Sequence, residues 1–247
     1  MRKKILITGA SSGLGAEMAR QFAAKGCDLA LCARRTERLA RVRDELTAAH
    51  PDVKISVAQL DVDDHDAVFQ VFQAFAAEFG SLDRVVVNAG LGKGQPIGTG
   101  GFEPNRQTAM TNFVAALAQC EAAMEIFRRQ NTGHLVMISS LSAVRGFPGN
   151  ATTYAASKAA ASTLAEGIRV DVLGTPIKVT TIQPGYIRSE MNDGRKVPMM
   201  AGTERGVRAI VNAIEKEKAV ADVPLWPWAP LGVLTRILPR RLFAKMI

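Results

Sequence analysis

Two residues in a segment of small side chains have the types and spacing for acid–base chemistry. The segment TTYAASKAAAS (residues 152–162) contains a phenol, Tyr154, and an ammonium group, Lys158, four positions apart. On a helix this spacing places both side chains on the same face. A free tyrosine has a pKa of about 10, and a neighbouring positive charge lowers that pKa because it favours the phenolate. The pair could therefore move a proton, although the same spacing also occurs as ordinary surface decoration.

A glycine-rich turn near the N-terminus could bind a pyrophosphate. The run KILIT (residues 4–8) predicts a buried strand, and Gly9, Gly13 and Gly15 follow it and open a predicted helix. Glycines permit a tight turn and let the backbone approach a phosphate, which the N-terminus of the helix attracts. The spacing GxxxGxG differs from the common GxGxxG fingerprint, so the prediction depends on the position between a strand and a helix.

Two arginines stand where a nicotinamide site chooses between its cofactors. The run DLALCA (residues 28–33) predicts a strand ending at Ala33, where a site for NAD(H) would place an acidic residue on the ribose 2′-hydroxyl. Arg34 and Arg35 come next, and a guanidinium forms charge-assisted bonds to a 2′-phosphate. The pair predicts NADP(H) over NAD(H), unless both arginines are only solvated charges at the start of a helix.

The elements that must position these groups alternate along the chain. Strands are predicted at residues 4–8, 28–33, 54–61, 83–90, 133–140 and 177–185, and helices at 13–26, 36–50, 63–80, about 103–130, 153–173 and from about 203 onward. This cadence is typical of parallel βαβ units and predicts an α/β fold with a doubly wound parallel sheet and helices on both faces. Ligands bind such sheets beyond the carboxyl ends of the strands.

Seven motifs, in order along the chain, resemble those of the classical short-chain dehydrogenase/reductase family. They are TGASSGLG at residues 8–15, LDV at 60–62, NAG at 88–90, Asn112, ISS at 138–140, YAASK at 154–158 and PG at 184–185. Each stands at a predicted strand end or on the expected helix, and the match runs from about Lys3 to Met191. The resemblance implies a single-domain Rossmann-type fold and an oxidoreductase that uses a nicotinamide cofactor.

The resemblance also implies which residues hold the cofactor. Asp61 resembles the residue that hydrogen-bonds the adenine amino group, although it could instead cap the helix that follows. Ile187 resembles the residue whose backbone holds the nicotinamide carboxamide, and Ser189 stands where the family usually has threonine. The complete predicted cofactor set is Gly9, Ser11, Ser12, Gly13, Leu14, Gly15, Arg34, Arg35, Asp61, Val62, Asn88, Ala89, Gly90, Tyr154, Lys158, Pro184, Gly185, Ile187 and Ser189.

The catalytic set implied by the resemblance is Asn112, Ser140, Tyr154 and Lys158. Tyr154 would be the acid/base, and Lys158 would lower its pKa and bond the ribose hydroxyls. Ser140 would orient the substrate oxygen, and Asn112 would link Lys158 to solvent through its backbone carbonyl and a water. Ser140 lies 14 residues before Tyr154, one more than the family's usual gap, so Ser142 is its competitor. Ser140 is preferred because it ends a strand.

Composition argues against several other kinds of protein. The three cysteines and three histidines form no ligand pattern, so neither a disulfide framework nor a metal site is expected. The apolar run after the first basic residues is too short for a signal peptide, and no stretch is long enough for a membrane span. The net charge of +8 admits an anionic partner, but no nucleic-acid-binding motif accompanies it.

The family pattern fades after Met191. We expect residues 1–190 to be the dinucleotide-binding and catalytic core, 191–222 a substrate loop and helix that form a lid in the same domain, and 223–247 a tail. Met191, Pro198, Met199 and Met200 suit a lid over an apolar substrate, or else ordinary packing.

The tail itself combines apolar and basic residues. It contains both tryptophans, it has no acidic residue after Asp222, and its bases are Arg236, Arg240, Arg241 and Lys245. Tryptophans beside such a segment suit a membrane interface. The alternative is a tail that packs on its own domain or on a partner subunit.

Together these features predict an NADP(H)-dependent oxidoreductase acting on a carbonyl or a secondary alcohol. We expect it to act as a reductase of an apolar, lipid-like or fatty-acyl substrate, in the cytoplasm or peripherally on the inner face of a membrane. The resemblance implies a homodimer or homotetramer. The alternative is a protein of the same fold that senses the cofactor without turnover.

Overall fold

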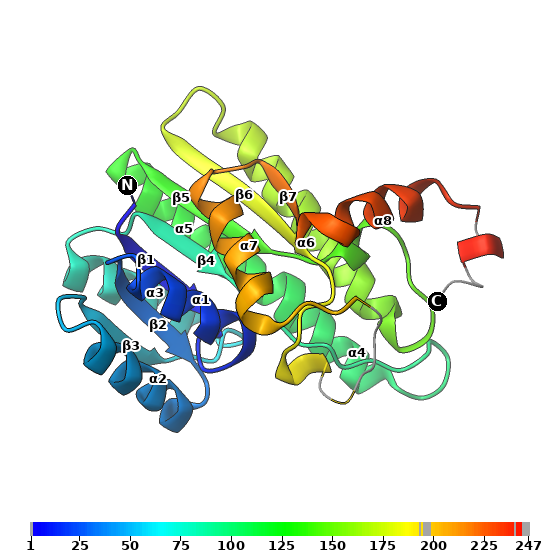
Figure 1. The fold of residues 1–247 in the computed structure, drawn as a ribbon, viewed down its shortest axis with the longest axis horizontal. Coiled ribbons are helices and arrows are strands. Elements are labelled where there is room, and N and C mark those ends of the chain that lie inside the picture. The colour runs from blue at the N-terminus through cyan, green and yellow to red at the C-terminus, as the bar shows by residue number, and fades with distance from the viewer. Residues whose placement is uncertain (1, 193, 195–198, 240, 244–247) are drawn as a thin grey trace.

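A parallel sheet forms the centre of the molecule. In the computed structural model, which describes residues 2–192, 194, 199–239 and 241–243, the sheet has seven strands in the order β3-β2-β1-β4-β5-β6-β7 (Figure 1). The strands are β1 (Lys4–Thr8), β2 (Asp28–Ala33), β3 (Ile55–Gln59), β4 (Arg84–Val87), β5 (Gly133–Ile138), β6 (Ile177–Pro184) and β7 (Val220–Val223). The chain builds outward from β1 to β3 and then returns to place β4 beside β1. The strand order therefore reverses between β1 and β4, where doubly wound sheets bind ligands.

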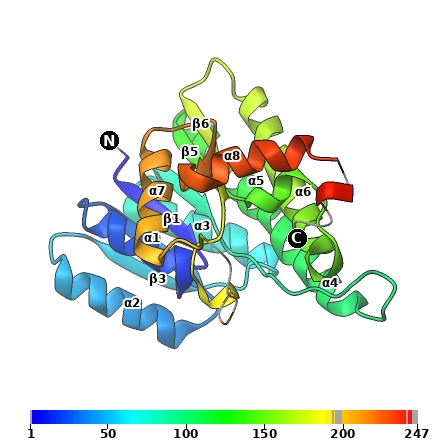
Figure 2. The same cartoon turned by 45° about the vertical axis from the view of Figure 1, so that its right-hand side comes forward.

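Helices cover both faces of this sheet, which confirms the predicted doubly wound Rossmann-type fold (Figures 1 and 2). One face carries α1 (Gly13–Ala23), α2 (Thr36–Ala49) and α7 (Thr203–Glu215), and the other carries α3 (His65–Phe79), α5 (Ala115–Gln130) and α6 (Thr152–Asp171). Successive side chains of a strand point to opposite faces. Thus Ile5 and Ile7 of β1 enter the core cluster under α1, whereas Leu6 enters the cluster under α5.

The segment between β4 and β5 is helical from Phe102 to Gln130, close to the helix that the sequence pattern predicts, but a π-helical turn interrupts it. It consists of α4 (Phe102–Ala109), a π-helical turn at Met110–Val114 and then α5. In this turn the N–H of Ala115 reaches back five residues to the carbonyl of Met110. Turns of this kind inside α-helices occur frequently at functional sites, and this one contains Asn112.

The C-terminal region adds two elements that the sequence pattern did not reveal. β7 extends the sheet beside β6, and α8 (Leu225–Ile237) lies at the same edge. The two tryptophans have opposite environments, because Trp228 is buried while Trp226 is 78% exposed. Part of the tail therefore packs on its own domain.

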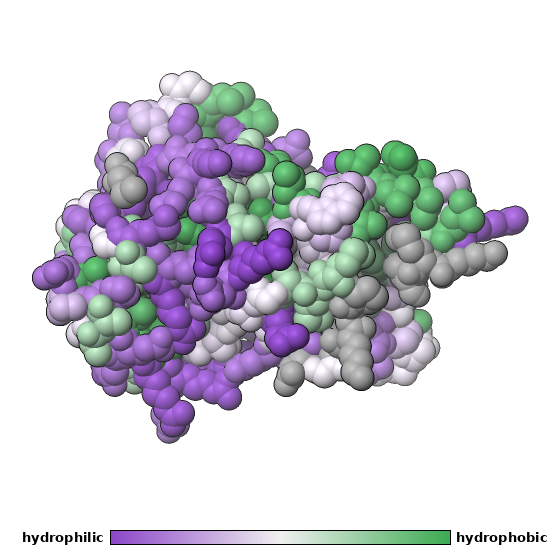
Figure 3. All heavy atoms as spheres, viewed as in Figure 1, coloured by the Kyte–Doolittle hydropathy of each residue, from purple (hydrophilic) through white to green (hydrophobic). Residues whose placement is uncertain are grey.

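The outer side of α8 remains apolar. Figure 3 shows hydrophobic residues gathered over this helix. The exposed ones are Leu225, Trp226, Val233, Leu234 and Ile237, and Leu242 follows them. Pro198, Arg240 and Lys245, which the sequence analysis singled out, lie outside the described residues. Among the described residues, no helix combines the length and the apolar character that crossing a membrane requires.

Candidate active site

An open cleft of about 540 Å³ lies at the carboxyl ends of the strands, between the loops that follow β1 and β4. Its walls come from the glycine turn, the starts of the loops after β2, β3 and β4, the end of β5, one face of α6 and the segment after β6. All the residues predicted to bind the cofactor line this cleft. Of the predicted catalytic residues, Ser140, Tyr154 and Lys158 also line it, and Asn112 lies behind the wall.

The glycine turn leaves no room for side chains. Gly9 and Gly13 adopt φ angles of +64° and +53°, a region that side chains disfavour. A Cβ on Gly15 would lie 2.3 Å from the carbonyl oxygen of Gly9, so α1 starts in direct contact with the turn. Ser12, the N-cap of α1, makes no side-chain capping bond, and the first turn of the helix has no acidic residue. The N-terminal N–H groups of α1 can therefore receive an anion such as a pyrophosphate.

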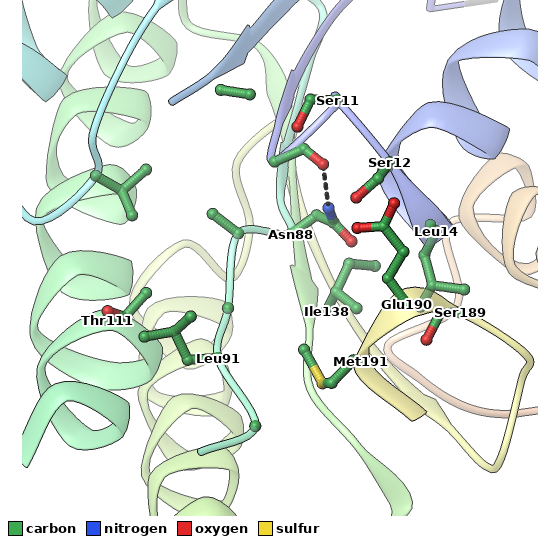
Figure 4. A pocket seen from close by; sticks show the side chains of 18 of the residues that line it. Ser11, Ser12, Leu14, Asn88, Leu91, Thr111, Ile138, Ser189, Glu190 and Met191 are labelled. Carbon is green, nitrogen blue, oxygen red and sulfur yellow. Dashed lines mark hydrogen bonds between the residues drawn. The ribbon is translucent and has the colours of Figure 1, made fainter. Parts of the chain in front are cut away.

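Thr8, which begins the first motif but was not predicted as a site residue, connects this turn to the loop after β4. Its buried hydroxyl accepts hydrogen bonds from the backbone N–H groups of Asn88 (3.0 Å) and Ala89 (3.1 Å). In return, the Asn88 side chain donates to the carbonyl of Thr8 at 2.8 Å. The two loops that face each other across the strand reversal are thus locked together, and Asn88 lies between them in Figure 4. The sequence feature that could have indicated this role is a hydroxyl side chain at the last residue of a buried strand.

The two predicted arginines point in different directions. Arg34 faces Asp61, with 3.8 Å between Nη1 and Oδ2. Arg35 leans over the glycine turn and donates to the hydroxyls of Ser11 (3.4 Å) and Ser12 (2.5 Å). The opening at this end of the cleft is therefore flanked by two guanidinium groups, and a 2′-phosphate would find donors on both sides.

Asp61 lies in the cleft wall and does not cap α3. The cap is Asp64, whose carboxylate accepts the N–H of Ala67 at 3.1 Å. The alternative interpretation of Asp61 as a helix cap is therefore wrong.

Lys158 is buried at the centre of the site. Its side chain is 6% exposed, and Nζ donates to the carbonyl oxygen of Ile138 at 2.9 Å. Burial lowers the pKa of this ammonium group to about 8. Ser139 completes the connection, because its hydroxyl donates to the backbone carbonyl of Lys158 at 2.9 Å. The end of β5 thus holds both the head group and the backbone of this lysine.

Asn112 acts as a clamp through its side chain. Its Oδ1 accepts the N–H of Leu91 at 2.7 Å, and its Nδ2 donates to the carbonyl of Leu91 at 2.9 Å and to Ser157 Oγ at 3.1 Å. The π-helical turn therefore joins the loop after β4 to α6, immediately beside Lys158. Leu91 was not predicted as a site residue.

Ser140 and its competitor Ser142 are bonded to each other. The N–H and the hydroxyl of Ser142 both donate to Ser140 Oγ, at 3.2 and 2.9 Å. Of these two hydroxyls, only that of Ser140 belongs to a residue lining the cleft. Ser142 thus orients the hydroxyl of Ser140 from behind.

The segment after β6 closes the other wall. Asn192 donates to the carbonyl of Ile187 at 2.7 Å and accepts the N–H of Ser189 at 2.9 Å, which fixes the short 3₁₀ turn Glu190–Asn192. Met191 reaches across the cleft, since a Cβ on Gly92 would lie 2.9 Å from its Cγ. Among the described residues, no group of three or more His, Cys, Asp or Glu is placed to hold a metal ion.

Known proteins resemble the chain over most of its length. A family model described as "short chain dehydrogenase" matches residues 3–199. An uncharacterised oxidoreductase of Mycobacterium tuberculosis is 53% identical over 98% of this chain and 96% of its own length. A short-chain dehydrogenase/reductase from Burkholderia phymatum, solved in complex with NAD, superposes with a TM-score of 0.84 at 21% identity, covering 99% of this chain and 95% of its own. An alcohol dehydrogenase from Thermococcus sibiricus, solved with 5-hydroxy-NADP, gives 0.80 at 24% identity and covers 89% and 94%.

Proposed function

Because the chain belongs to the classical short-chain dehydrogenase/reductase family, we propose that it is an NADP(H)-dependent enzyme that interconverts a carbonyl and a secondary alcohol. Membership of this family supports an oxidoreductase acting on CH–OH groups. The nicotinamide cofactor, when bound, supplies or accepts the hydride. The protein must then position the substrate oxygen and exchange a proton with it.

Tyr154 is the proposed acid/base of this reaction. It lies one helical turn before Lys158 on the same face of α6, and both residues line the cleft. The charge of Lys158 favours the phenolate and so lowers the pKa of the tyrosine. An ammonium group has three N–H donors, so the bond to Ile138 leaves donors for the ribose hydroxyls. Ser140, oriented by Ser142, orients the substrate oxygen, and Asn112 positions the loop beside Lys158.

The preference for NADP(H) rests on one observation, which is the placement of Arg35 across the glycine turn. Ala33 puts no carboxylate at the end of β2, while Arg35 bonds Ser11 and Ser12 at the phosphate-binding turn. Each charge-assisted bond to a 2′-phosphate contributes about 1.5–3 kcal/mol. The two solved structures named above hold cofactors of both kinds, so they favour neither cofactor.

The test compares kcat/KM for NADPH and NADH in the wild type, Arg34→Asp, Arg35→Asp and the control Arg41→Asp, which lies further along α2. We expect the first two substitutions to move the preference toward NADH and the control to leave it unchanged. An unchanged ratio in both cleft variants would refute the assignment of NADP(H).

We further propose that the substrate is apolar and that the enzyme works as a reductase in the cytoplasm, where most of the NADP(H) pool is in the reduced form. Met191 lines the cleft and is half exposed, and Leu91 lies on the opposite wall. A panel of carbonyl compounds of rising chain length, followed by NADPH oxidation, would test this. Rising kcat/KM with chain length supports an apolar substrate, whereas no turnover with any member favours the cofactor-sensing alternative.

Contact of the tail with a membrane is a separate proposal. The exposed apolar side of α8, with Arg236 and Arg241 near its end, supports peripheral binding to anionic lipid. Trp228 packs on Gly185, so removal of the whole tail would damage the domain. Flotation with anionic vesicles should therefore compare the wild type with Trp226→Ser and Ile237→Ser, at sites 78% and 73% exposed. Equal recovery in the soluble fraction would exclude α8 as an anchor.

A homodimer or homotetramer is also proposed. Val170 in the last turn of α6 and Leu173 just beyond it are exposed, which supports an interface at this end of the helix. Light scattering of the purified chain decides the oligomeric state, and a monomer at all concentrations would exclude this proposal.

A further inference from the structure

The carboxylate of Glu190 forms ion pairs with two arginines, Arg35 and Arg38, at the rim of the cleft. Glu190 Oε2 lies 3.0 Å from Arg35 Nη1, and Glu190 Oε1 lies 2.6 Å from Arg38 Nη1. Both oxygens of the carboxylate are therefore engaged, one by each guanidinium. Neither Arg38 nor Glu190 was singled out by the sequence, because the two residues are 152 positions apart.

This ion pair is continuous with the phosphate-binding turn. The same guanidinium of Arg35 that holds Glu190 also bonds the hydroxyls of Ser11 and Ser12. Figure 4 shows Glu190 reaching from the segment after β6 to lie beside Ser12. The carboxylate thus stands against the arginine that a 2′-phosphate of the cofactor would use.

We propose that Arg38 joins Arg34 and Arg35 in the 2′-phosphate site of this protein, and that Glu190 holds Arg35 and Arg38 until NADP(H) displaces the carboxylate. This inference rests on the proposed function, since it assigns Arg38 as a further phosphate ligand and Glu190 as its competitor. Arg38 and Glu190, together with Arg35, then determine how much more tightly the protein binds NADP(H) than NAD(H).

The charges make such an exchange favourable. The hydrogen bond from Arg35 lowers the pKa of Glu190, with the charge of Arg38 adding to the effect, so the carboxylate is ionised at neutral pH. A phosphate monoester carries about −1.5 to −2 charges and three acceptor oxygens, whereas the carboxylate carries one charge and two oxygens. The three side chains are about half exposed, and ion pairs of that kind are weak. A phosphate can therefore replace Glu190, but the 2′-hydroxyl of NAD(H) brings no charge with which to do so.

The experiment measures the Kd of NADPH and of NADH by fluorescence titration of the full chain. Glu190→Gln removes the competing charge and keeps the shape, so we expect NADPH to bind about two- to fivefold more tightly and NADH to bind as before. Arg38→Gln should weaken NADPH by roughly tenfold at low salt, with little effect on NADH. Glu37→Gln and Arg41→Gln, on the same helix as Arg38, are the matched controls, and neither should change the Kd of either cofactor.

The double variant separates competition from a general change of charge. In Arg38→Gln the addition of Glu190→Gln should improve NADPH binding less than it does in the wild type, because one partner of the carboxylate is already missing. Unchanged NADPH binding in Glu190→Gln would overturn the inference. Weaker NADH binding in this variant would also overturn it, because that result would mean that Glu190 binds the ribose hydroxyls. If the wild type binds NADPH no better than NADH, the proposed cofactor preference itself is wrong, which is a different result.

Discussion

Lys158 Nζ donates a hydrogen bond of 2.9 Å to the carbonyl oxygen of Ile138, the last residue of β5. This contact joins the buried ammonium of α6 to the strand that leads into Ser140. Because Ser139 bonds the backbone of Lys158 at the same time, the lysine cannot shift without moving the strand end. The position of the proposed acid–base pair is therefore set by the sheet.

The first prediction concerns the cost of keeping this lysine buried. The pKa of Lys158 falls from 10.5 to about 8 because burial disfavours the charged form. We expect Lys158→Met to abolish turnover but to raise the free energy of unfolding of the cofactor-free protein by about 1–2 kcal/mol at neutral pH, since the gain from removing a buried charge exceeds the lost hydrogen bond.

The pH dependence provides the check on that prediction. Between about pH 8 and pH 10.5 the unfolded chain holds a proton on Lys158 that the folded chain releases, so the stability of the wild type rises with pH in this window. The difference between wild type and variant, measured by urea unfolding, should be constant below about pH 8 and shrink above it. A variant that is less stable at every pH would show that the bond to Ile138 outweighs the burial cost.

The second prediction tests the acid/base itself. Tyr154→Phe keeps the aromatic ring and removes the hydroxyl, so NADPH should bind nearly as before while turnover falls by about a hundredfold or more. Tyr186, the other of the two tyrosines in the chain, serves as the control. Tyr186→Phe should retain turnover, because its ring packs on Trp228, and the hydroxyl has no part in the proposed chemistry. Substantial activity in Tyr154→Phe would mean that another group carries the proton.

The sequence predicted the parts of the site that depend on local chain chemistry. The glycine turn, Arg34 and Arg35, Ser140 and the Tyr154–Lys158 pair each follow a strand or sit on one helix face, and all of them line a single cleft. The glycine turn, the arginine pair and the spacing of Tyr154 and Lys158 are local properties of the sequence, so they could be recognised without coordinates. Ser140 was implied by the family resemblance. The roles of these residues remain predictions that the experiments above test.

The features that escaped the sequence depend on contacts between distant segments or on small backbone adjustments. Arg38 and Glu190 each look like solvated charges until the fold brings them together. The π-helical turn at Asn112 hardly disturbs the apolar pattern of the surrounding helix, so the pattern predicted the helix but not the turn inside it. The three prolines from residue 224 to residue 230 weaken the helical pattern of this part of the sequence. The helix α8 is instead stabilised by the tertiary packing of Trp228, which is buried.

The third prediction concerns that packing. A Cβ on Gly185 would lie 2.2 Å from Cδ2 of Trp228, so α8 docks against the bare backbone after β6. Gly185→Ala should lower the free energy of unfolding by about 1–3 kcal/mol and alter the fluorescence of the buried tryptophan. Gly146→Ala is the matched control, because nothing lies within 4 Å of its added Cβ. Equal stability of the two variants would mean that α8 can move away without cost.

The fourth prediction concerns acid stability and a buried histidine at the opposite end of the sheet. His134 of β5 accepts a hydrogen bond from Arg84 Nε at 2.9 Å through Nδ1, which leaves Nε2–H to donate to Thr180 Oγ1 at 2.8 Å. Burial, and then the charges of Arg84 and Arg2, lower its pKa to about 2. The carboxylate of Glu217 lies 3.9 Å from Nδ1 and is itself paired with Arg2.

Since the pKa of this histidine is depressed on folding, the unfolded chain binds a proton below about pH 6.5 that the folded chain does not. The free energy of unfolding should therefore fall as the pH drops, approaching a slope of about 1.4 kcal/mol per pH unit from this group once the pH is well below that value. His134→Gln should lower the free energy of unfolding at neutral pH, because Arg84 loses the hydrogen-bond acceptor Nδ1. The same variant should make the fall of the free energy of unfolding at acid pH less steep. His50→Gln, at the end of α2, controls for the loss of a histidine, and urea unfolding between about pH 7 and pH 4.5 measures all three proteins. An equally steep acid slope in His134→Gln would place the acid sensitivity in other groups.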